Sequence, residues 1–138
     1  MAGNMNEELQ NIGATIQYMQ AQQQLLVNQI NMISNAIIRM GYMLETVSEL
    51  ENPGIQYVNA GNNVFLPVKI DSEKGIIIEL GAGFFANVGK NDAIDYLGRR
   101  KQKLEMNMER ARAINDNLNE RINTLNNRAM EIAGTQQS

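Results

Sequence analysis

Three large apolar side chains recur at intervals of seven residues in a part of the chain that carries no charge. Tyr18, Leu25 and Met32 all fall within residues 9–38, which contain no Asp, Glu, Lys or Arg. Exposed apolar side chains make adaptable, non-directional contacts, and Met in particular suits surfaces that bind many different ligands. The chemistry that this spacing favours is therefore reversible apolar binding.

The residue types that usually carry catalysis or bind metals are scarce. The chain has 138 residues with no cysteine and no histidine. Their absence removes thiol nucleophiles, disulfides, thiolate metal sites and the commonest general base. Because only scattered carboxylates remain, we expect no enzyme activity and no cofactor. The formal net charge of −3 does not favour a nucleic acid partner, since such binding usually depends on a basic excess.

Two short motifs each allow two interpretations. Gly81-Ala82-Gly83 could be a phosphate loop, but it lacks the Lys of a P-loop and precedes a strand, so a hairpin turn is favoured. Arg99-Arg100-Lys101 with Lys103 could contact nucleic acid or an acidic partner. In an acidic chain, a solvated helix surface is the simpler interpretation of that cluster.

Two long heptad patterns must position these groups. Positions separated by alternating steps of three and four residues are apolar from Leu9 to Val47, and Gln23 is the one polar residue among these positions. The same spacing of apolar positions runs from Ile94 to Ile132, and among these positions Lys101 and Asn115 are polar. A 3.5-residue period sustained over several turns is typical of a coiled coil. Each apolar seam needs a partner, and the nearest partner is the other helix, so we expect an antiparallel hairpin.

Capping and helix-breaking residues mark the ends of the two helices. We expect helix one over residues 6–51, ended by Asn52-Pro53-Gly54, because Pro cannot continue the hydrogen-bond ladder. We expect helix two over residues 91–133, with Asn91 as its N-cap and Gly134 as its C-terminal stop.

The polar residues of the two seams suggest a register. If positions 47 and 91 face each other at the base of the hairpin, Gln23 and Asn115 fall at the same height. Polar seam residues lower stability and can fix the register of a coiled coil. The alternative is that each break is independent and exposed to water.

The segment between the helices contains an internal repeat. Val58–Val68 and Ile78–Val88 share a β-branched residue, a Gly, a Gly or Asn, and a Phe in the same order, and each copy has the pattern strand, tight turn, strand. Pro67 cannot donate a ladder hydrogen bond, so we expect it at an edge or a bulge. The four expected strands, which form two β-hairpins over residues 55–88, lie near 55–60, 64–70, 75–80 and 84–88.

Four short strands cannot bury both of their faces, so we expect them to complete a sheet or barrel with another subunit. The predicted fold is α+β: within a single unit, residues 1–138, a long antiparallel two-helix coiled-coil hairpin is joined by two small β-hairpins that complete an intersubunit β-barrel. The residues that we expect to be buried in that assembly are Phe65, Val68, Ile76, Ile77, Ile78, Phe84 and Phe85.

The uncharged stretch is not expected to span a membrane. Gln and Asn residues interrupt every apolar run in residues 9–38, far short of the roughly 18 residues that a span requires. The N-terminus also lacks the basic start and apolar core of a signal peptide. We therefore expect a cytoplasmic protein without a membrane partner.

The hairpin motifs resemble those of a known family. Ile78-Glu79-Leu80-Gly81-Ala82-Gly83-Phe84 is similar to the second-hairpin signature of prefoldin α-type subunits, and Val58–Phe65 is similar to the first-hairpin pattern. Asn59 and Asn63 stand where the family commonly has Pro and Gly, but Asn63 can still adopt the left-handed turn conformation. The order of helix, two hairpins and helix matches the family over almost the whole chain.

The resemblance implies an ATP-independent chaperone, or holdase, in a hexamer of two α-type and four β-type subunits. The partners would be β-type subunits, a second copy of this chain, unfolded client proteins and a group II chaperonin that receives the clients. The family's strands form a central double barrel, and its coiled-coil tips hold the clients. The client-binding residues implied for this chain are Met1, Met5, Leu9, Ile12, Tyr18, Leu25, Met32, Met130 and Ile132.

Two alternatives remain open. Tyr18, Leu25 and Met32 could pack on a helix of a neighbouring subunit instead of on clients, because exposed apolar stripes serve either purpose. The chain could also be a structural coiled-coil protein that forms filaments or scaffolds through its β-hairpins and never binds clients.

Overall fold

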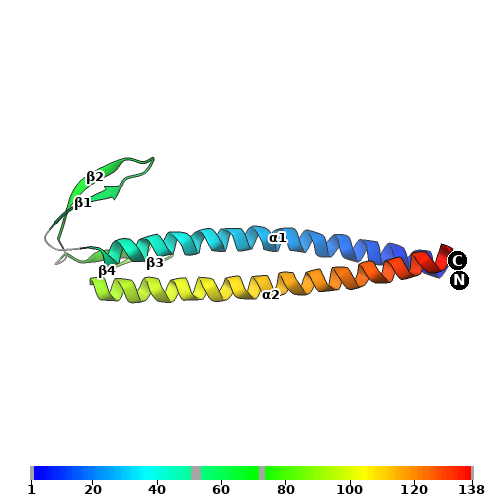
Figure 1. The fold of residues 1–138 in the computed structure, drawn as a ribbon. Helices are drawn as coiled ribbons and strands as arrows, with labels where there is room; N and C mark the ends of the chain where they lie inside the picture. The colour runs from blue at the N-terminus through cyan, green and yellow to red at the C-terminus, as the bar shows by residue number, and fades with distance from the viewer. Residues whose placement is uncertain (1, 51–53, 72–73, 138) are drawn as a thin grey trace. The chain divides into compact units, whose positions relative to one another are not determined.

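Along the chain, a long helix is followed by two β-hairpins and then by a second long helix (Figure 1). The computed structural model describes residues 2–50, 54–71 and 74–137. This order of elements confirms the predicted fold class. The elements are α1 (Ala2–Ser48), β1 (Gly54–Asn59), β2 (Phe65–Ile70), β3 (Ile76–Gly81), β4 (Phe84–Val88) and α2 (Lys90–Gln137).

Contacts between residues divide the chain into two compact units. The coiled-coil unit consists of Met1–Asn35 and Glu105–Ser138, and the hairpin unit consists of Ala36–Leu104. Each helix contributes one part to each unit.

The seam of the coiled-coil unit is made by the predicted heptad positions. Met19 of α1 packs against Leu118 and Ile122 of α2, and all three side chains are at most 8% exposed. Ile16 and Leu125 pack against the same cluster, so residues earlier in α1 meet residues later in α2. The two segments are therefore antiparallel, as the shared 3.5-residue period of the two seams predicted.

Gln23 and Asn115 were expected at the same height of the seam, and the hydrogen-bond partner of Gln23 lies within one helical turn of Asn115. The side chain of Gln23 is hydrogen bonded to Asn119, which lies one turn further along α2. The Oδ1 atom of Asn115 is buried without a hydrogen-bond partner in the described part of the chain. The short Asn115 side chain sits in the seam itself, whereas Asn119 is an exposed residue beside the seam.

The ends of α1 differ from the prediction. The helix begins at Ala2, four residues before the expected start, and ends at Ser48. The amide of Glu49 donates to the carbonyl of Glu45 at 3.0 Å, and the amide of Leu50 donates to Val47 at 3.3 Å, which closes the last turn. The predicted breakers Asn52 and Pro53, and the predicted last residue Glu51, lie outside the described residues.

The ends of α2 also differ from the prediction. The amide of Ala93 donates to the carbonyl of Gly89 at 2.9 Å, so Gly89 occupies the capping position and Asn91 lies inside the first turn. Gly134 does not end the helix, which continues to Gln137. A single helical Gly costs only about 1 kcal/mol relative to Ala, so the helix tolerates it.

The first hairpin pairs β1 with β2 in an antiparallel register that places Tyr57 opposite Pro67. The amide of Ala60 donates to the carbonyl of Val64 at 2.8 Å and closes the turn between the strands. Asn63 has a φ of 62°, which confirms the left-handed conformation predicted for it.

The second hairpin pairs β3 with β4, with an irregularity between Glu79 and Gly81. Gly81, Ala82 and Gly83 all have positive φ, at 113°, 52° and 79°. The hairpin-turn interpretation of this motif is therefore confirmed. None of the helices in the described ranges is long and apolar enough to cross a membrane.

Candidate functional site

The apolar stripe, formed by Tyr18, Leu25 and Met32, lies on the α1 part of the coiled-coil unit. These side chains are 66%, 70% and 72% exposed. Their spacing of seven residues places them at one heptad position outside the seam. Hairpin packing does not require apolar groups there, so the stripe is available to another molecule.

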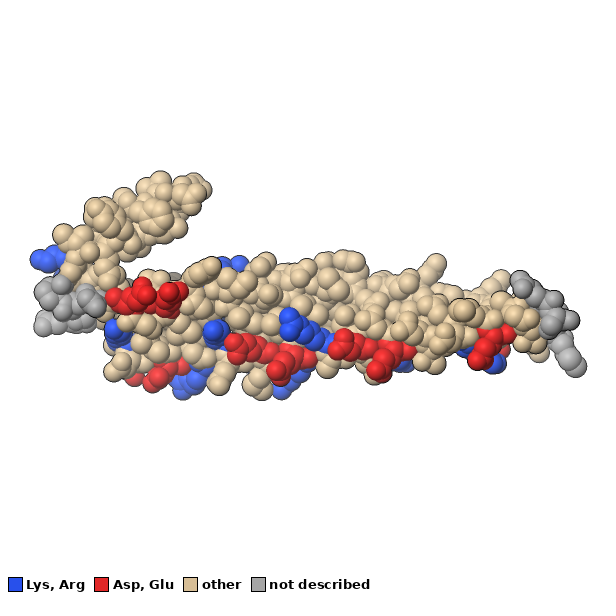
Figure 2. Space-filling model, viewed as in Figure 1, with Lys and Arg blue, Asp and Glu red and all other residues tan. Residues whose placement is uncertain are grey.

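The surroundings of the stripe are polar but uncharged. The amide of Gln22 donates to the phenolic oxygen of Tyr18 at 2.9 Å, and the amide of Gln24 donates to Asn28 at 3.3 Å. Figure 2 shows that the charged side chains of this unit gather over α2, whereas the α1 side has almost none. An apolar ligand therefore meets hydrogen-bonding groups around the stripe but little electrostatic repulsion.

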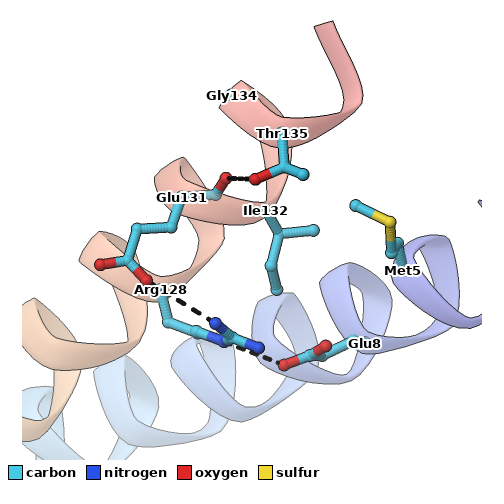
Figure 3. A pocket seen from close by; sticks show the side chains of 7 residues that line it. All are labelled: Met5, Glu8, Arg128, Glu131, Ile132, Gly134 and Thr135. Carbon is cyan, nitrogen blue, oxygen red and sulfur yellow. Dashed lines mark hydrogen bonds and ion pairs between the residues drawn. The ribbon is translucent and has the colours of Figure 1, made fainter. Parts of the chain in front are cut away.

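A pocket of about 630 Å³ lies where the first turns of α1 meet the last turns of α2 (Figure 3). The Nε of Arg128 donates to Oε1 of Glu8 at 3.1 Å, and its Nη1 lies 3.6 Å from Oε2 of Glu131. Arg128 thus links the two helices by an ion pair at the rim of the pocket. The lining residues are Met5, Glu8, Arg128, Glu131, Ile132, Gly134 and Thr135.

The structure separates the predicted client-binding residues into two groups. Met130 is 69% exposed, and Met5 and Leu9 are half-buried, so all three can contribute to a surface. Ile12 and Ile132 are only 8% and 4% exposed. Both are seam positions whose side chains face the opposite helix, so they offer a client little exposed surface. Met1 lies outside the described residues.

The hairpins present a second apolar surface. Phe65, Ile77, Phe84 and Phe85 are 57%, 71%, 71% and 64% exposed. The described residues of the single chain therefore leave these four side chains largely uncovered. Two other residues expected in the assembly, Val68 and Ile76, are half-buried.

Ile78 was predicted to be buried by assembly, but the single chain already covers it. Its side chain is 8% exposed and is already buried within the hairpin unit. It lines a groove of about 700 Å³ together with Met40 of α1 and Leu97 of α2. Successive side chains of a strand point to opposite faces, so Ile78 turns toward the helices while Ile77 turns away.

Six further apolar residues of the hairpins are exposed and were not among the predicted assembly residues. Three of them lie on β1, which contains none of the predicted residues, and the alternation of Ile55 with Tyr57 in a predicted strand is the signal that could have indicated these two. The six are Ile55 (71% exposed), Tyr57 (72%), Val58 (43%), Val64 (53%), Leu66 (50%) and Leu80 (51%).

The carboxylates of the described residues do not form a metal site. No group of three acidic side chains in residues 2–50, 54–71 and 74–137 is arranged to hold a metal ion. The exposed apolar side chains mark two candidate surfaces, the apolar stripe and the hairpins, and both are suited to binding other chains.

Comparison with known proteins identifies the family. The model of the family described as prefoldin subunit matches residues 18–135. This chain belongs to the prefoldin family. It is 28% identical over 134 residues to the prefoldin subunit alpha of Methanosarcina acetivorans, covering 93% of this chain and 94% of that protein. It is 26% identical over 137 residues to the prefoldin subunit alpha of Pyrococcus horikoshii, covering 96% of this chain and 91% of that protein.

A solved structure shows the same fold. The crystal structure of the prefoldin beta subunit from Thermococcus strain KS-1 matches with a TM-score of 0.62 and 16% identity, covering 89% of this chain and 90% of that chain. The curated relatives are α subunits, so the interpretation of this chain as an α-type prefoldin subunit is confirmed. It is a subunit of a chaperone that assembles with other prefoldin subunits.

The departures of this prefoldin subunit from the family's first-hairpin pattern are accommodated locally. Asn62 has a φ of 50°, beside the positive φ of Asn63. Asn tolerates this region better than other non-Gly residues. The Oδ1 of Asn59 accepts a hydrogen bond from the amide of Gly61 at 2.9 Å, which supports the turn from within.

Proposed function

We propose that this prefoldin subunit acts as an ATP-independent holdase. It works in a cytoplasmic hetero-hexamer of two α-type and four β-type subunits, binds unfolded proteins on its coiled coils, and delivers them to a group II chaperonin. The observation that carries the proposal is the apolar stripe. Three large apolar side chains are at least 66% exposed in a stretch that has no charge.

The stripe supports client binding for physical reasons. Unfolded proteins expose apolar side chains in no fixed arrangement, and apolar contact is non-directional, so one surface can accept many sequences. The surrounding Gln and Asn side chains keep the surface hydrated while it is empty. Met130, which is 69% exposed near the end of α2, extends the binding surface beyond the stripe.

The decisive experiment replaces the stripe without touching the seam. Tyr18, Leu25 and Met32 are changed together to Ser, the oligomer is confirmed by its mass, and suppression of the aggregation of a model client is measured. The proposal predicts normal assembly with most of the holdase activity lost. Unchanged activity would contradict it, and loss of assembly would favour packing of the stripe on a neighbouring subunit.

A matched control lies one heptad position away. Gln17, Gln24 and Asn31 are exposed, repeat every seven residues and precede the three stripe residues directly. Changing these three to Ser alters the same helix by the same number of substitutions. It should leave both assembly and holdase activity close to those of the unmodified protein.

The second candidate is a filament- or scaffold-forming role. The observation in its favour is the exposure of both hairpins, since Tyr57 and Ile77 are 72% and 71% exposed in the single chain. Mass measurement of the chain alone and with a β-type subunit separates the two functions. Open-ended polymers of the pure chain favour the scaffold, and a defined hexamer with the partner favours the holdase.

A further inference from the structure

Oxidation of this chain must fall mainly on methionine. The sequence holds nine Met residues and no Cys, His or Trp, so the thiols that usually react first with peroxides are absent. A thioether sulfur that takes up one oxygen atom becomes a sulfoxide, which converts a flexible apolar side chain into a polar one. The position of each Met therefore decides what an oxidant changes in the molecule.

The described methionines include an exposed pair and a seam pair. The exposed pair, Met32 and Met130, has side chains that are 72% and 69% exposed. The seam pair, Met19 and Met40, has side chains that are 7% and 6% exposed. Because an oxidant dissolved in water must reach the sulfur atom, the exposed pair should react while the seam pair is spared.

Met32 is one of the three side chains of the apolar stripe, and its surroundings favour the oxidised form. Gln29 and Asn35 are exposed and lie three residues before and after Met32 on α1, which places them beside it on the helix surface. Their amide groups can donate hydrogen bonds, and a sulfoxide oxygen is an acceptor. Oxidation therefore turns one end of the stripe into a hydrated, polar position.

The coiled coil itself should survive this change. Met19 packs against Leu118 and Ile122 inside the seam, where the oxidant has little access. Changes to exposed side chains away from buried contacts usually alter stability little. Oxidation of the exposed pair would thus change the surface of the coiled-coil unit without disrupting its packing.

We propose that Met32 and Met130 are sites of reversible oxidation, and that peroxide converts the apolar stripe from a client-binding surface to a non-binding one. This inference rests on the proposed binding of clients by the stripe. In the forward step, hydrogen peroxide transfers one oxygen atom to the Met sulfur, the O–O bond breaks, and the other oxygen leaves as water. The sulfur loses two electrons, and the peroxide gains them.

The return step requires a methionine sulfoxide reductase. Two thiols of the reductase are oxidised to a disulfide, the S–O bond breaks, and the oxygen leaves as water. The thiols must belong to the reductase, because this chain has no Cys.

The direct test maps the sulfoxides by mass spectrometry after the complex with a β-type subunit is treated with hydrogen peroxide. The exposed pair should be oxidised about tenfold faster than the seam pair, and the complex should stay assembled. Equal rates for the two pairs would overturn the inference. Protection of Met32 in the complex but not in the chain alone would also overturn it, because the stripe would then be packed against a neighbouring subunit.

Leu substitutions connect the oxidation to client capture. Met32→Leu with Met130→Leu keeps the apolar volume and removes both sulfur atoms. After peroxide treatment, the affinity of the unmodified complex for a model client should fall about tenfold, as the change of a buried apolar side chain into a polar one implies. The double variant should keep its affinity. Methionines of the partner subunit are common to both samples, so they cannot produce the difference.

A matched control removes two other exposed sulfur atoms. Met43 and Met106 are 46% and 52% exposed and lie outside the stripe. Met43→Leu with Met106→Leu should lose client capture on oxidation as the unmodified complex does, and incubation with the reductase should restore capture in both. Resistance of this control, with loss of capture in the variant of the exposed pair, would overturn the inference.

The Ser variant of the stripe separates this inference from the proposed function. If changing Tyr18, Leu25 and Met32 to Ser abolishes client capture but complete oxidation of Met32 leaves it unchanged, the stripe binds clients and the redox inference alone is wrong. If the Ser variant captures clients normally, both are wrong. Met32→Gln places a permanent polar group at the same position and should weaken capture without any oxidant.

Discussion

Gln23 of α1 donates a hydrogen bond from its side-chain amide to Oδ1 of Asn119 of α2. One turn earlier on α2, Asn115 has a buried Oδ1 without a partner in the described residues. The polar break in the α1 seam is therefore satisfied by a residue beside the seam. The break in the α2 seam is left unsatisfied, and the two breaks have different energetic consequences.

Asn115→Leu should raise the melting temperature of the protein. A buried polar group without a hydrogen-bond partner destabilises a fold by about 1–3 kcal/mol, and Leu also adds apolar volume to the seam. Thermal unfolding at a fixed protein concentration measures the change. Gln23→Leu is the contrast. It removes the hydrogen-bond partner of Asn119, which is exposed, so the melting temperature should shift less. A lower melting temperature for Asn115→Leu would show that Asn115 has a partner in the assembled protein.

The ion pair between Glu8 and Arg128 should contribute little to stability. Their side chains are 43% and 54% exposed, and exposed pairs typically contribute about 0.2–1 kcal/mol. Glu8→Gln should therefore lower the free energy of unfolding by less than about 1 kcal/mol at low salt, and the difference should vanish in about 1 M salt, where the screening length is short. A larger loss that persists in high salt would contradict this estimate.

Periodicity predicted the helices and the seam because both depend on local spacing. Met19 and Leu118 lie at heptad positions and are buried as expected. Ile12 and Ile132 were assigned both to the seam and to the client surface, and the seam prevails because burial of an apolar side chain is favourable. One side chain cannot serve both purposes at once.

Details that depend on individual hydrogen bonds were not predictable from the pattern. Asn91 is a good N-cap by residue type, but the carbonyl of Gly89 accepts the first helical hydrogen bond. The hydrogen-bond partner of Gln23 is Asn119, which is not a seam position, so counting heptad positions does not predict it. Ile78 is buried because β3 turns one face toward the helices, a tertiary arrangement that the strand pattern alone does not contain.

Ile77→Asp should abolish the oligomer while leaving the helix content largely intact. Ile77 is 71% exposed in the single chain, so a charge there disturbs little of the packing within the hairpin unit. In an assembly it would bury a carboxylate, which is strongly unfavourable. Circular dichroism and mass measurement together test this expectation. Assembly at the normal mass would show that this face of the second hairpin is not an interface.

Ile78→Asp is the paired comparison for that experiment. Ile78 is 8% exposed, so its replacement should destabilise the single chain itself and lower the melting temperature before assembly is considered. If both variants behaved alike, the separation of the two faces of β3 would be wrong.

Ala82→Gly should stabilise the second hairpin. Ala82 has a φ of 52°, in the left-handed region, where a Cβ atom costs about 1–2 kcal/mol. Gly removes that strain but adds freedom to the unfolded chain, which leaves a net gain of roughly 0.5–1 kcal/mol. The melting temperature should rise accordingly. Gly81→Ala, at a φ of 113°, should lower it, and a rise for that variant would contradict the argument.

Client capture should depend little on ionic strength. The apolar stripe lies within residues 9–38, which contain no charged side chain. Salt screens interactions between exposed charges, but it does not weaken apolar contact, and sulfate strengthens it. The fraction of a model client that is bound should therefore stay nearly constant between about 50 mM and 500 mM sodium chloride, and should rise in ammonium sulfate. The oligomer's mass is followed in the same solutions, so that any loss of assembly is not mistaken for loss of binding. A steep fall in capture with sodium chloride, at constant mass, would assign the clients to the charged surface of α2 instead of the stripe.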